Sequence, residues 1–115
     1  MTIARLRLGA AGEDLAAQWY EHRGFEVVDR NWRTRFGEID LVVAQIGVLA
    51  FCEVKTRSSA AFGTGFEAVT PRKQAKLRTL ASEWLRVNPS AHFRSIRFDV
   101  ASVVAGKIEV LEDAF

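Results

Sequence analysis

The 115-residue sequence predicts one α/β domain, residues 1–115, with a mixed five-stranded sheet flanked by helices in the order α-β-β-β-α-β-β. Two helical patterns alternate with runs of β-forming residues, which favours helices packed on a sheet. Two of the strand segments are apolar on both faces, as is typical of strands at the centre of a covered sheet. With 49% hydrophobic and 26% charged residues, the chain has the composition of an ordinary globular domain.

The first helix is expected over residues 8–23. Leu8, Leu15 and Trp19 recur there at helical spacing with alanines beside them. Gly24 follows, and glycine readily adopts the left-handed conformation that ends many helices. This spacing predicts a helix with one apolar side.

Three strands are expected next. Residues 25–33, FEVVDRNWR, are rich in β-forming side chains and predict the first strand. A hairpin follows, with strands at residues 39–44 and 48–55 and a turn near residues 45–47. Both faces of the hairpin strands are apolar, so the hairpin is expected in the middle of the sheet.

The second half of the chain contains the clearest helical pattern. After a loop at residues 57–69, a Thr-Pro pair supplies an N-cap oxygen and a proline at the first position of a helix over residues 71–87. The last two strands are expected at residues 95–104 and 107–112, joined by an Ala-Gly turn. The predicted buried stripe of this helix is Leu77, Leu80, Ala81, Trp84 and Leu85.

The hairpin carries charged residues within or at the ends of its apolar strands: Glu38, Asp40, Glu53 and Lys55. Side chains alternate across a strand, so Glu53 and Lys55 share a face. A two-residue turn would place Asp40 opposite Glu53, with Cβ atoms about 5 Å apart, and Glu38 opposite Lys55. A three-residue turn would put Asp40 and Glu53 on opposite faces, so the turn length decides whether a site exists.

Facing carboxylates repel each other, and a divalent cation between them removes the repulsion. Oxygen-only ligands select hard cations, so Mg²⁺ or Mn²⁺ is expected. A water on such a metal is a nucleophile for phosphodiester hydrolysis, and a nearby lysine can orient it or stabilise negative charge on the phosphate. The alternative is a cross-strand salt bridge, Glu53 to Lys55 or Glu38 to Lys55, on a solvated face. The spacing and its apolar context leave both interpretations open.

Several segments resemble the YraN family of bacterial proteins, which are predicted endonucleases. These segments are GEDLAAQWYEHRGFEVVDRNWRTRFGEIDLVV, LAFCEVKTRSSAAFGTGFEAV, KQAKL and RFDV, and they cover most of the chain. The resemblance implies membership of the PD-(D/E)xK nuclease superfamily, similar to archaeal Holliday-junction resolvases. It further implies a restriction-endonuclease-like three-layer fold and a Mg²⁺- or Mn²⁺-dependent endonuclease that acts on branched or otherwise structured DNA.

Matched position by position, the resemblance assigns the metal to the carboxylates of Asp40 and Glu53 and to the backbone carbonyl of Val54. It makes Lys55 the catalytic lysine and Glu13, on the first helix, a further catalytic and metal-binding acid. An acidic residue at Glu13 would also stabilise the first turns of a helix without binding metal, so both roles stay open. The superfamily's proline before the first aspartate is absent, and isoleucine stands there.

The middle of the chain is basic, with nine basic and four acidic residues between Arg30 and Arg78. This charge suggests a polyanionic partner, which we expect to be nucleic acid and specifically DNA. The candidate phosphate contacts are Arg57, Lys73, Gln74 and Lys76. Two other interpretations remain: a non-catalytic nucleic-acid-binding module with a nuclease-like fold, and a protein whose basic stretch binds an acidic protein. A homodimer is implied by analogy with resolvases only.

The remaining features are structural or concern location. The single cysteine, Cys52, excludes an internal disulfide and is expected to be a small buried residue, which fits a reducing cytoplasm. Asp99 is expected to form a hydrogen bond with the backbone of a neighbouring strand. The basic N-terminus has no apolar segment after it and no apolar run reaches membrane length, so neither a signal peptide nor a membrane span is expected.

Overall fold

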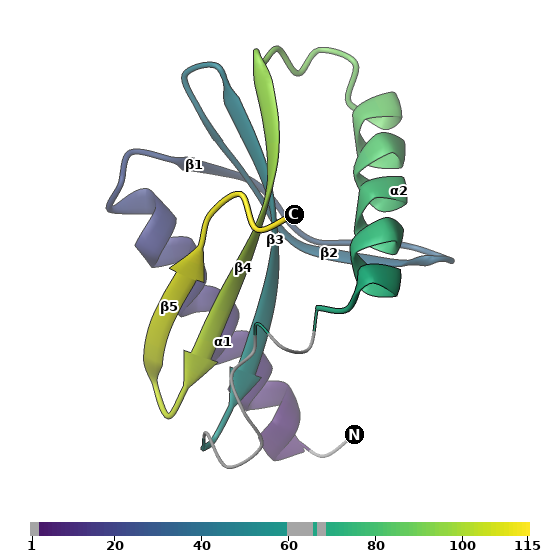
Figure 1. The fold of residues 1–115 in the computed structure, drawn as a ribbon. Helices are drawn as coiled ribbons and strands as arrows, with labels where there is room; N and C mark the ends of the chain where they lie inside the picture. Colours follow the sequence, from purple (N-terminus) through teal and green to yellow (C-terminus); the bar gives the residue numbers. More distant parts are fainter. Residues whose placement is uncertain (1–2, 60–65, 67–68) are drawn as a thin grey trace.

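The computed structural model describes residues 3–59, 66 and 69–115. These residues form one mixed sheet with the spatial strand order β1-β2-β3-β4-β5 (Figure 1). Neighbouring strands are antiparallel except β3 and β4, which are parallel. The α/β class, the mixed five-stranded sheet and the element order are confirmed. The elements are α1 (Ile3–Glu21), β1 (Glu26–Thr34), β2 (Gly37–Gln45), β3 (Val48–Arg57), α2 (Pro71–Val87), β4 (Ser95–Val104) and β5 (Lys107–Leu111).

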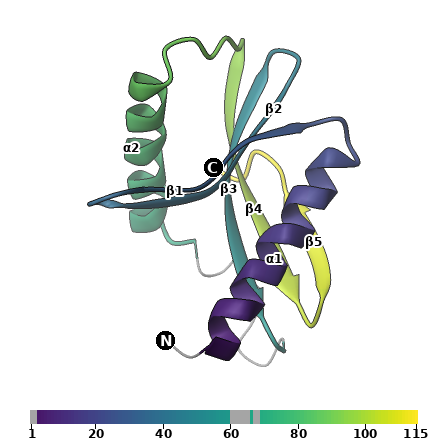
Figure 2. The same ribbon diagram turned by 180° about the vertical axis from the view of Figure 1, so that it is seen from behind.

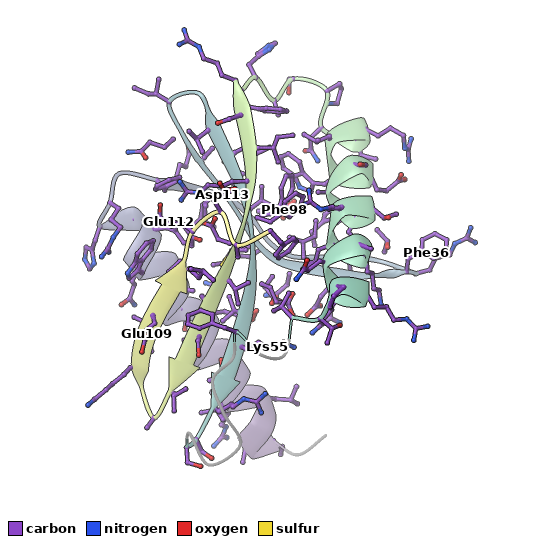
Figure 3. The ribbon with its side chains drawn as sticks, in the orientation of Figure 1. Phe36, Lys55, Phe98, Glu109, Glu112 and Asp113 are labelled. Atoms are coloured by element: carbon purple, nitrogen blue, oxygen red, sulfur yellow. The ribbon has the colours of Figure 1, made fainter. Side chains whose placement is uncertain are left out.

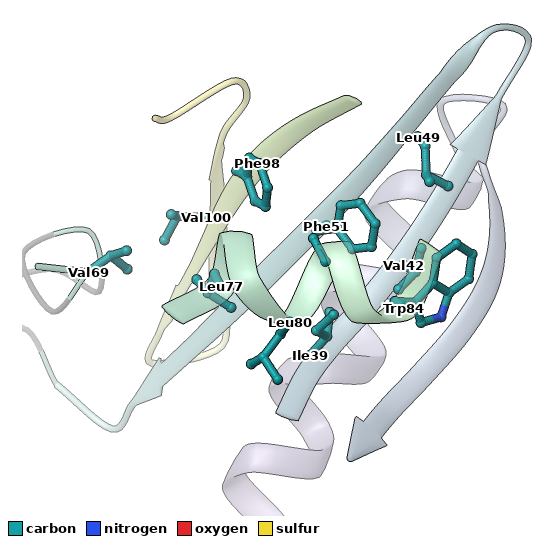
Figure 4. Close-up of a cluster of buried hydrophobic side chains, with 11 residues drawn as sticks. Ile39, Val42, Leu49, Phe51, Val69, Leu77, Leu80, Trp84, Phe98 and Val100 are labelled. Carbon is teal, nitrogen blue, oxygen red and sulfur yellow. The ribbon is translucent and has the colours of Figure 1, made fainter. Parts of the chain in front are cut away.

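The two helices cover opposite faces of the sheet, as the views from either side show (Figures 1 and 2). Tyr20 of α1 is fully buried in a cluster with Leu41 and Val43 of β2. On the other face, Trp84 of α2 packs in a cluster with Phe51 of β3 (Figure 4). Parallel strands need a crossover connection, and α2 lies in the connection between β3 and β4. The central strands are therefore covered on both sides, as their apolar faces predicted.

The β2–β3 hairpin has the two-residue turn on which the predicted site depends. Its ladder runs without a register shift from the turn to the pair Leu41 and Cys52. The next residues along the two strands are Asp40 and Glu53, and Oδ2 of Asp40 accepts a hydrogen bond from the backbone N–H of Val54 at 2.8 Å. The predicted register is confirmed, so the two carboxylates belong to the same side of the sheet.

The second half of the sequence was predicted closely. The bounds of α2 and β4 agree with the expected ones, and β5 ends one residue early at Leu111. The buried residues of α2 are Leu77, Leu80, Ala81 and Trp84, whereas Leu85 is only partly buried. Strand β3 continues to Arg57 because it keeps pairing with β4 up to Val104. No helix in the described part of the chain is long and apolar enough to cross a membrane.

Helix α1 differs from the prediction in its length and in the face it buries. It begins at Ile3 rather than at residue 8. Ile3 and Leu6 of the added turns are exposed, so no buried apolar stripe marks this part of the helix. The predicted stripe of Leu8, Leu15 and Trp19 is only partly buried. The face on the sheet consists of small residues and one tyrosine at four-residue spacing: Gly12, Ala16 and Tyr20.

Gly12 allows α1 to lie very close to β3. A Cβ atom placed at Gly12 would lie 3.0 Å from the Cβ of Thr56 and inside the contact distance of its Oγ1. Real side chains do not approach this closely, so the contact requires glycine. The next residue of α1, Glu13, is thereby brought to the C-terminal half of β3, where the predicted site lies.

We expect Gly12→Ala to lower the free energy of unfolding by about 1 kcal/mol or more, because the added methyl group overpacks the contact with Thr56. The matched control is Gly9→Ala in the same helix, where a Cβ has nothing within 4 Å. That change should raise stability by about 0.5–1 kcal/mol through helix propensity. Chemical denaturation of both variants measures the difference. If Gly12→Ala is as stable as Gly9→Ala, α1 does not lie as close to Thr56 as described.

Candidate functional site

A pocket of about 820 Å³ lies where the N-terminal half of α1, the C-terminal half of β3 and the first turns of α2 meet. Lys55 is labelled there, between β3 and the N-terminal end of α2 (Figure 3). The pocket brings together residues that are far apart in the sequence and come from both helical layers. The predicted site residues that line it are Glu13, Asp40, Glu53, Val54, Lys55, Arg57, Lys73 and Lys76.

Asp40 is a buried carboxylic acid beside a second one. Its side chain is only 8% exposed, and one of its oxygens accepts the N–H of Val54. Burial, and after it the neighbouring Glu53 carboxylate, raise the pKa of Asp40 to about 8. The free site therefore holds Asp40 in an environment that disfavours its negative charge.

Glu53 is equally buried but has positive partners. One of its oxygens, Oε1, lies 3.0 Å from the Lys73 ammonium and 3.3 Å from the Lys55 ammonium. Burial, and after it the adjacent Lys73 ammonium, lower the pKa of Lys55. The predicted Glu53–Lys55 ion pair exists, but it lies inside the pocket rather than on a solvated face.

Lys73 was predicted only as a phosphate contact, and its position on Glu53 was missed. Thr70 caps α2, with its Oγ1 accepting the backbone N–H of Lys73 at 3.3 Å, and Pro71 follows at the first helical position. This cap fixes where α2 begins and so places Lys73 in its first turn. Nothing local in the sequence could show that this turn faces Glu53, because that depends on how α2 packs on the sheet.

Glu13 lines the pocket from the side of α1. With the Asn31 amide nitrogen oriented toward it, the two Glu13 oxygens accept hydrogen bonds at 2.7 and 3.1 Å. Burial raises the pKa of Glu13, and the Arg30 guanidinium partly offsets this effect. Asn31 has a φ of 50°, a left-handed conformation that asparagine tolerates better than most residues. An asparagine within a strand pattern was the only sequence signal for this partner.

The other predicted residues are distributed around the pocket. Glu38 pairs with Arg33 rather than with Lys55. Its carboxylate accepts a hydrogen bond from Nε of Arg33 at 2.6 Å across the β1–β2 hairpin. Gln74 lies outside the lining, and its amide nitrogen donates to the Val69 carbonyl at 3.1 Å. Arg57 lines the pocket, and its Nε is buried without a hydrogen-bond partner among the described residues. A nucleic-acid role for Arg57 and Gln74 remains a prediction.

The donors fit a hard divalent cation held by few protein ligands. Asp40 and Glu53 supply adjacent carboxylates, and Mg²⁺ is commonly bound through one or two carboxylates with several waters. Among the described residues, no three His, Cys, Asp or Glu side chains are grouped closely enough to hold a metal. Glu13 lines the same pocket from α1, and after burial and the Glu53 charge its own charge contributes to the raised pKa of Asp40. An ion at Oε1 of Glu53 would compete with the two ammonium groups that lie on that oxygen.

The fold and the pocket define a class: an α/β domain with buried acids and lysines gathered at the ends of its central strands. The model of the family described as "Uncharacterised protein family UPF0102" matches residues 12–103. A UPF0102 protein of Rhodococcus opacus is 50% identical to this chain, and the match covers 96% of this chain and 97% of the Rhodococcus protein. A UPF0102 protein of Beutenbergia cavernae is 52% identical, and the match covers 88% of this chain and 85% of that protein. The chain belongs to the UPF0102 family, which confirms the YraN-like family indicated by the motifs.

The raised pKa of Asp40 predicts how stability changes with pH. Between about pH 4 and about pH 8 the folded chain holds a proton on Asp40 that the unfolded chain releases, so stability falls as pH rises through this range. Asp40→Asn removes the ionisation and keeps an acceptor for the Val54 N–H. Without divalent cations, the variant should therefore exceed the wild type by about 1 kcal/mol or more at pH 8, and by little at pH 4.

Urea denaturation at several pH values measures this difference. The control is Asp14→Asn, which changes an exposed acid of α1 paired with Arg30. Since exposed ion pairs contribute little, this variant should be no more stable than the wild type at any pH. An Asp40→Asn stability curve that runs parallel to the wild-type curve would exclude an unfavourable Asp40 charge in the folded state.

Proposed function

We propose that the protein is a divalent-metal-dependent nuclease that hydrolyses phosphodiester bonds in DNA of branched or otherwise non-standard structure. The observation that carries this proposal is the side-by-side placement of the Asp40 and Glu53 carboxylates with Lys55 in one open pocket. A mixed five-stranded sheet between two helical layers is consistent with the restriction-endonuclease-like fold that the motif resemblance implies.

Each group in the pocket has a role in such a reaction. Asp40, Glu53 and the Val54 carbonyl would hold Mg²⁺ or Mn²⁺, which supplies charge stabilisation and an acidified water. Lys55 donates hydrogen bonds that orient the attacking water or stabilise negative charge on the phosphate. Glu13, which lines the pocket from α1, assists by accepting hydrogen bonds from waters in the site.

The second lysine fits the same proposal. Lys73 and Lys55 share one oxygen of Glu53, where both ammonium groups would compete with a divalent cation. A Lys73 side chain that left Glu53 would be able to contact the DNA phosphate from the first turn of α2. Arg57 and Lys76 add positive charge on the pocket wall. Cutting both strands of a junction requires two such sites, so we include a homodimer in the proposal by analogy with resolvases.

A second candidate function is a nucleic-acid-binding module that retains the fold and cuts nothing. It is favoured by one observation, the occupation of Glu53 by two ammonium groups, which already neutralise the carboxylate without a metal. This candidate predicts DNA affinity that falls steeply with salt and no metal-dependent product.

Cleavage is tested with labelled junction, flap, single-stranded and duplex DNA in the presence of Mg²⁺ or Mn²⁺. We expect Asp40→Asn and Lys55→Ala each to lower the cleavage rate at least about 100-fold, because each removes a group that acts on the transition state. Lys107→Ala, an exposed lysine at the start of β5 outside the pocket, is the control and should cut normally. Cleavage that survives in both pocket variants would disprove the proposed site. DNA binding without any product would favour the binding module.

Metal binding is tested apart from cleavage by thermal unfolding with Mn²⁺. A ligand that binds only the folded chain stabilises it, by about 2.7 kcal/mol at 100 times its dissociation constant. We expect Mn²⁺ to raise the melting temperature of the wild type and not that of Asp40→Asn. Equal shifts in both proteins would show that the ion binds elsewhere.

A further inference from the structure

The turn between β1 and β2 projects from the body of the domain. Figures 1 and 2 show this hairpin extending past α2, and Phe36 is labelled at its end in Figure 3. Thr34 pairs with Gly37, so the turn consists of Arg35 and Phe36. The Phe36 side chain is 63% exposed, and it is the aromatic residue among the large hydrophobic side chains that are exposed in the described part of the chain. Such exposure of a phenylalanine has no role in packing the domain.

The hairpin tip is held in place by short-range contacts. Thr34 Oγ1 accepts the backbone N–H of Phe36 at 3.0 Å, which fixes the turn. Side chains of α2 reach the base of the hairpin, since a Cβ built at Gly37 would lie 2.9 Å from Cε of Lys76 and 3.3 Å from Cδ1 of Leu80. These contacts favour one conformation of the turn. Binding through it would therefore cost less conformational entropy than binding through a flexible loop.

One cation lies against the Phe36 ring, and two more lie on neighbouring positions. The Arg35 guanidinium lies 4.9 Å from the ring centroid. Arg33, two residues before Arg35 in β1, is exposed and paired with Glu38 at 2.6 Å. Lys76 lies at the base of the hairpin and also lines the pocket. An aromatic ring among cations is the combination with which proteins bind single-stranded nucleic acid, where the ring stacks on a base and the cations contact phosphates.

The tip is also close to the proposed catalytic groups. Glu38, two residues from Phe36, lines the pocket. Asp40 is four residues from Phe36 along β2, which corresponds to about 13 Å of strand. This distance equals about four nucleotides at the spacing of a stacked strand. A nucleic acid with a phosphate in the pocket that runs along β2 toward the tip would therefore come within reach of Phe36.

We infer that Phe36 stacks on an unpaired nucleobase within about four nucleotides of the phosphate held in the pocket, while Arg33 and Arg35 contact the adjoining phosphates. The inference rests on the proposed nucleic-acid function of the pocket and specifies its substrate class. A paired base in intact duplex must first be unstacked, at a cost of a few kcal/mol, before it can stack on Phe36. The tip therefore selects flaps, junctions and single strands over duplex.

The experiment measures binding in EDTA, so that nothing is cut. The probes are a flap and a duplex of the same sequence, with 2-aminopurine at successive positions of the unpaired strand. We expect Phe36→Ala to weaken flap binding about 10-fold and duplex binding less than about 2-fold. The change in 2-aminopurine emission that marks stacking should disappear in Phe36→Ala and persist in Phe36→Trp.

The control is Ile46→Ala, which removes the fully exposed side chain at the turn of the other hairpin, at the opposite end of β2. It should bind every probe like the wild type. Since Phe36 and Ile46 are both exposed, neither variant should lose the circular-dichroism spectrum of the folded chain. Equal flap binding by wild type and Phe36→Ala would overturn the inference. So would conversion of a dimer to a monomer by Phe36→Ala in sedimentation, because the tip would then contact a second copy of the chain.

This outcome is separable from that of the proposed nuclease activity. Flap binding that depends on Phe36, together with no metal-dependent product, supports the hairpin inference and rejects the nuclease. Metal-dependent cleavage with no effect of Phe36→Ala on binding supports the nuclease and rejects the inference. A wild-type chain that binds none of the probes in EDTA and also gives no product with Mg²⁺ or Mn²⁺ rejects both.

Discussion

Two carboxyl groups shielded from water, those of Asp40 and Glu53, are the constraint on which the rest of the site depends. Like charges in such a place repel each other, and each must be neutralised by a proton, an ammonium group or a metal ion. In the free protein the two acids have different surroundings. Asp40 has its pKa raised, whereas Glu53 is paired with Lys55 and Lys73. The surrounding elements are arranged so that this unequal pair opens onto a pocket.

A third buried acid shows the contrast with a purely structural role. Asp99 of β4 is fully buried, and its oxygens accept hydrogen bonds from the Tyr20 hydroxyl, the Arg97 guanidinium and the backbone N–H of Asp113. Asp99 does accept a backbone hydrogen bond, but the donor is Asp113 in the segment after β5 rather than, as was predicted, a residue of a neighbouring strand. Both oxygens of the buried Asp99 carboxylate have hydrogen-bond donors. The carboxylate thereby connects α1, β4 and the C-terminal segment. Asp40 has one backbone donor and a carboxylate neighbour, an arrangement that stabilises the fold less and leaves an oxygen for another partner.

The sequence predicted the parts of the site that depend on strand geometry. Alternation along β3 and the two-residue turn were enough to place Asp40 against Glu53 and Lys55 beside them. Lys73 on Glu53 could not be predicted, because its position depends on the packing of α2, which no local pattern encodes. The face of α1 that packs on the sheet was predicted wrongly. The prediction followed the spacing of large apolar side chains, whereas the close contact is made by Gly12. The nuclease chemistry rests on the motif resemblance, since carboxylates and lysines at this spacing also form ion pairs.

The position of the pocket between both helical layers links it to the completion of folding. Glu13 reaches it from α1 on one face of the sheet and Lys73 from α2 on the other, while the central strands supply the remaining groups. A chain that has docked only one helix lacks one wall of the pocket and part of its set of acids and lysines. Partly folded copies, such as those still emerging from the ribosome, therefore carry no assembled site, and the chemistry of the pocket belongs to the finished domain alone.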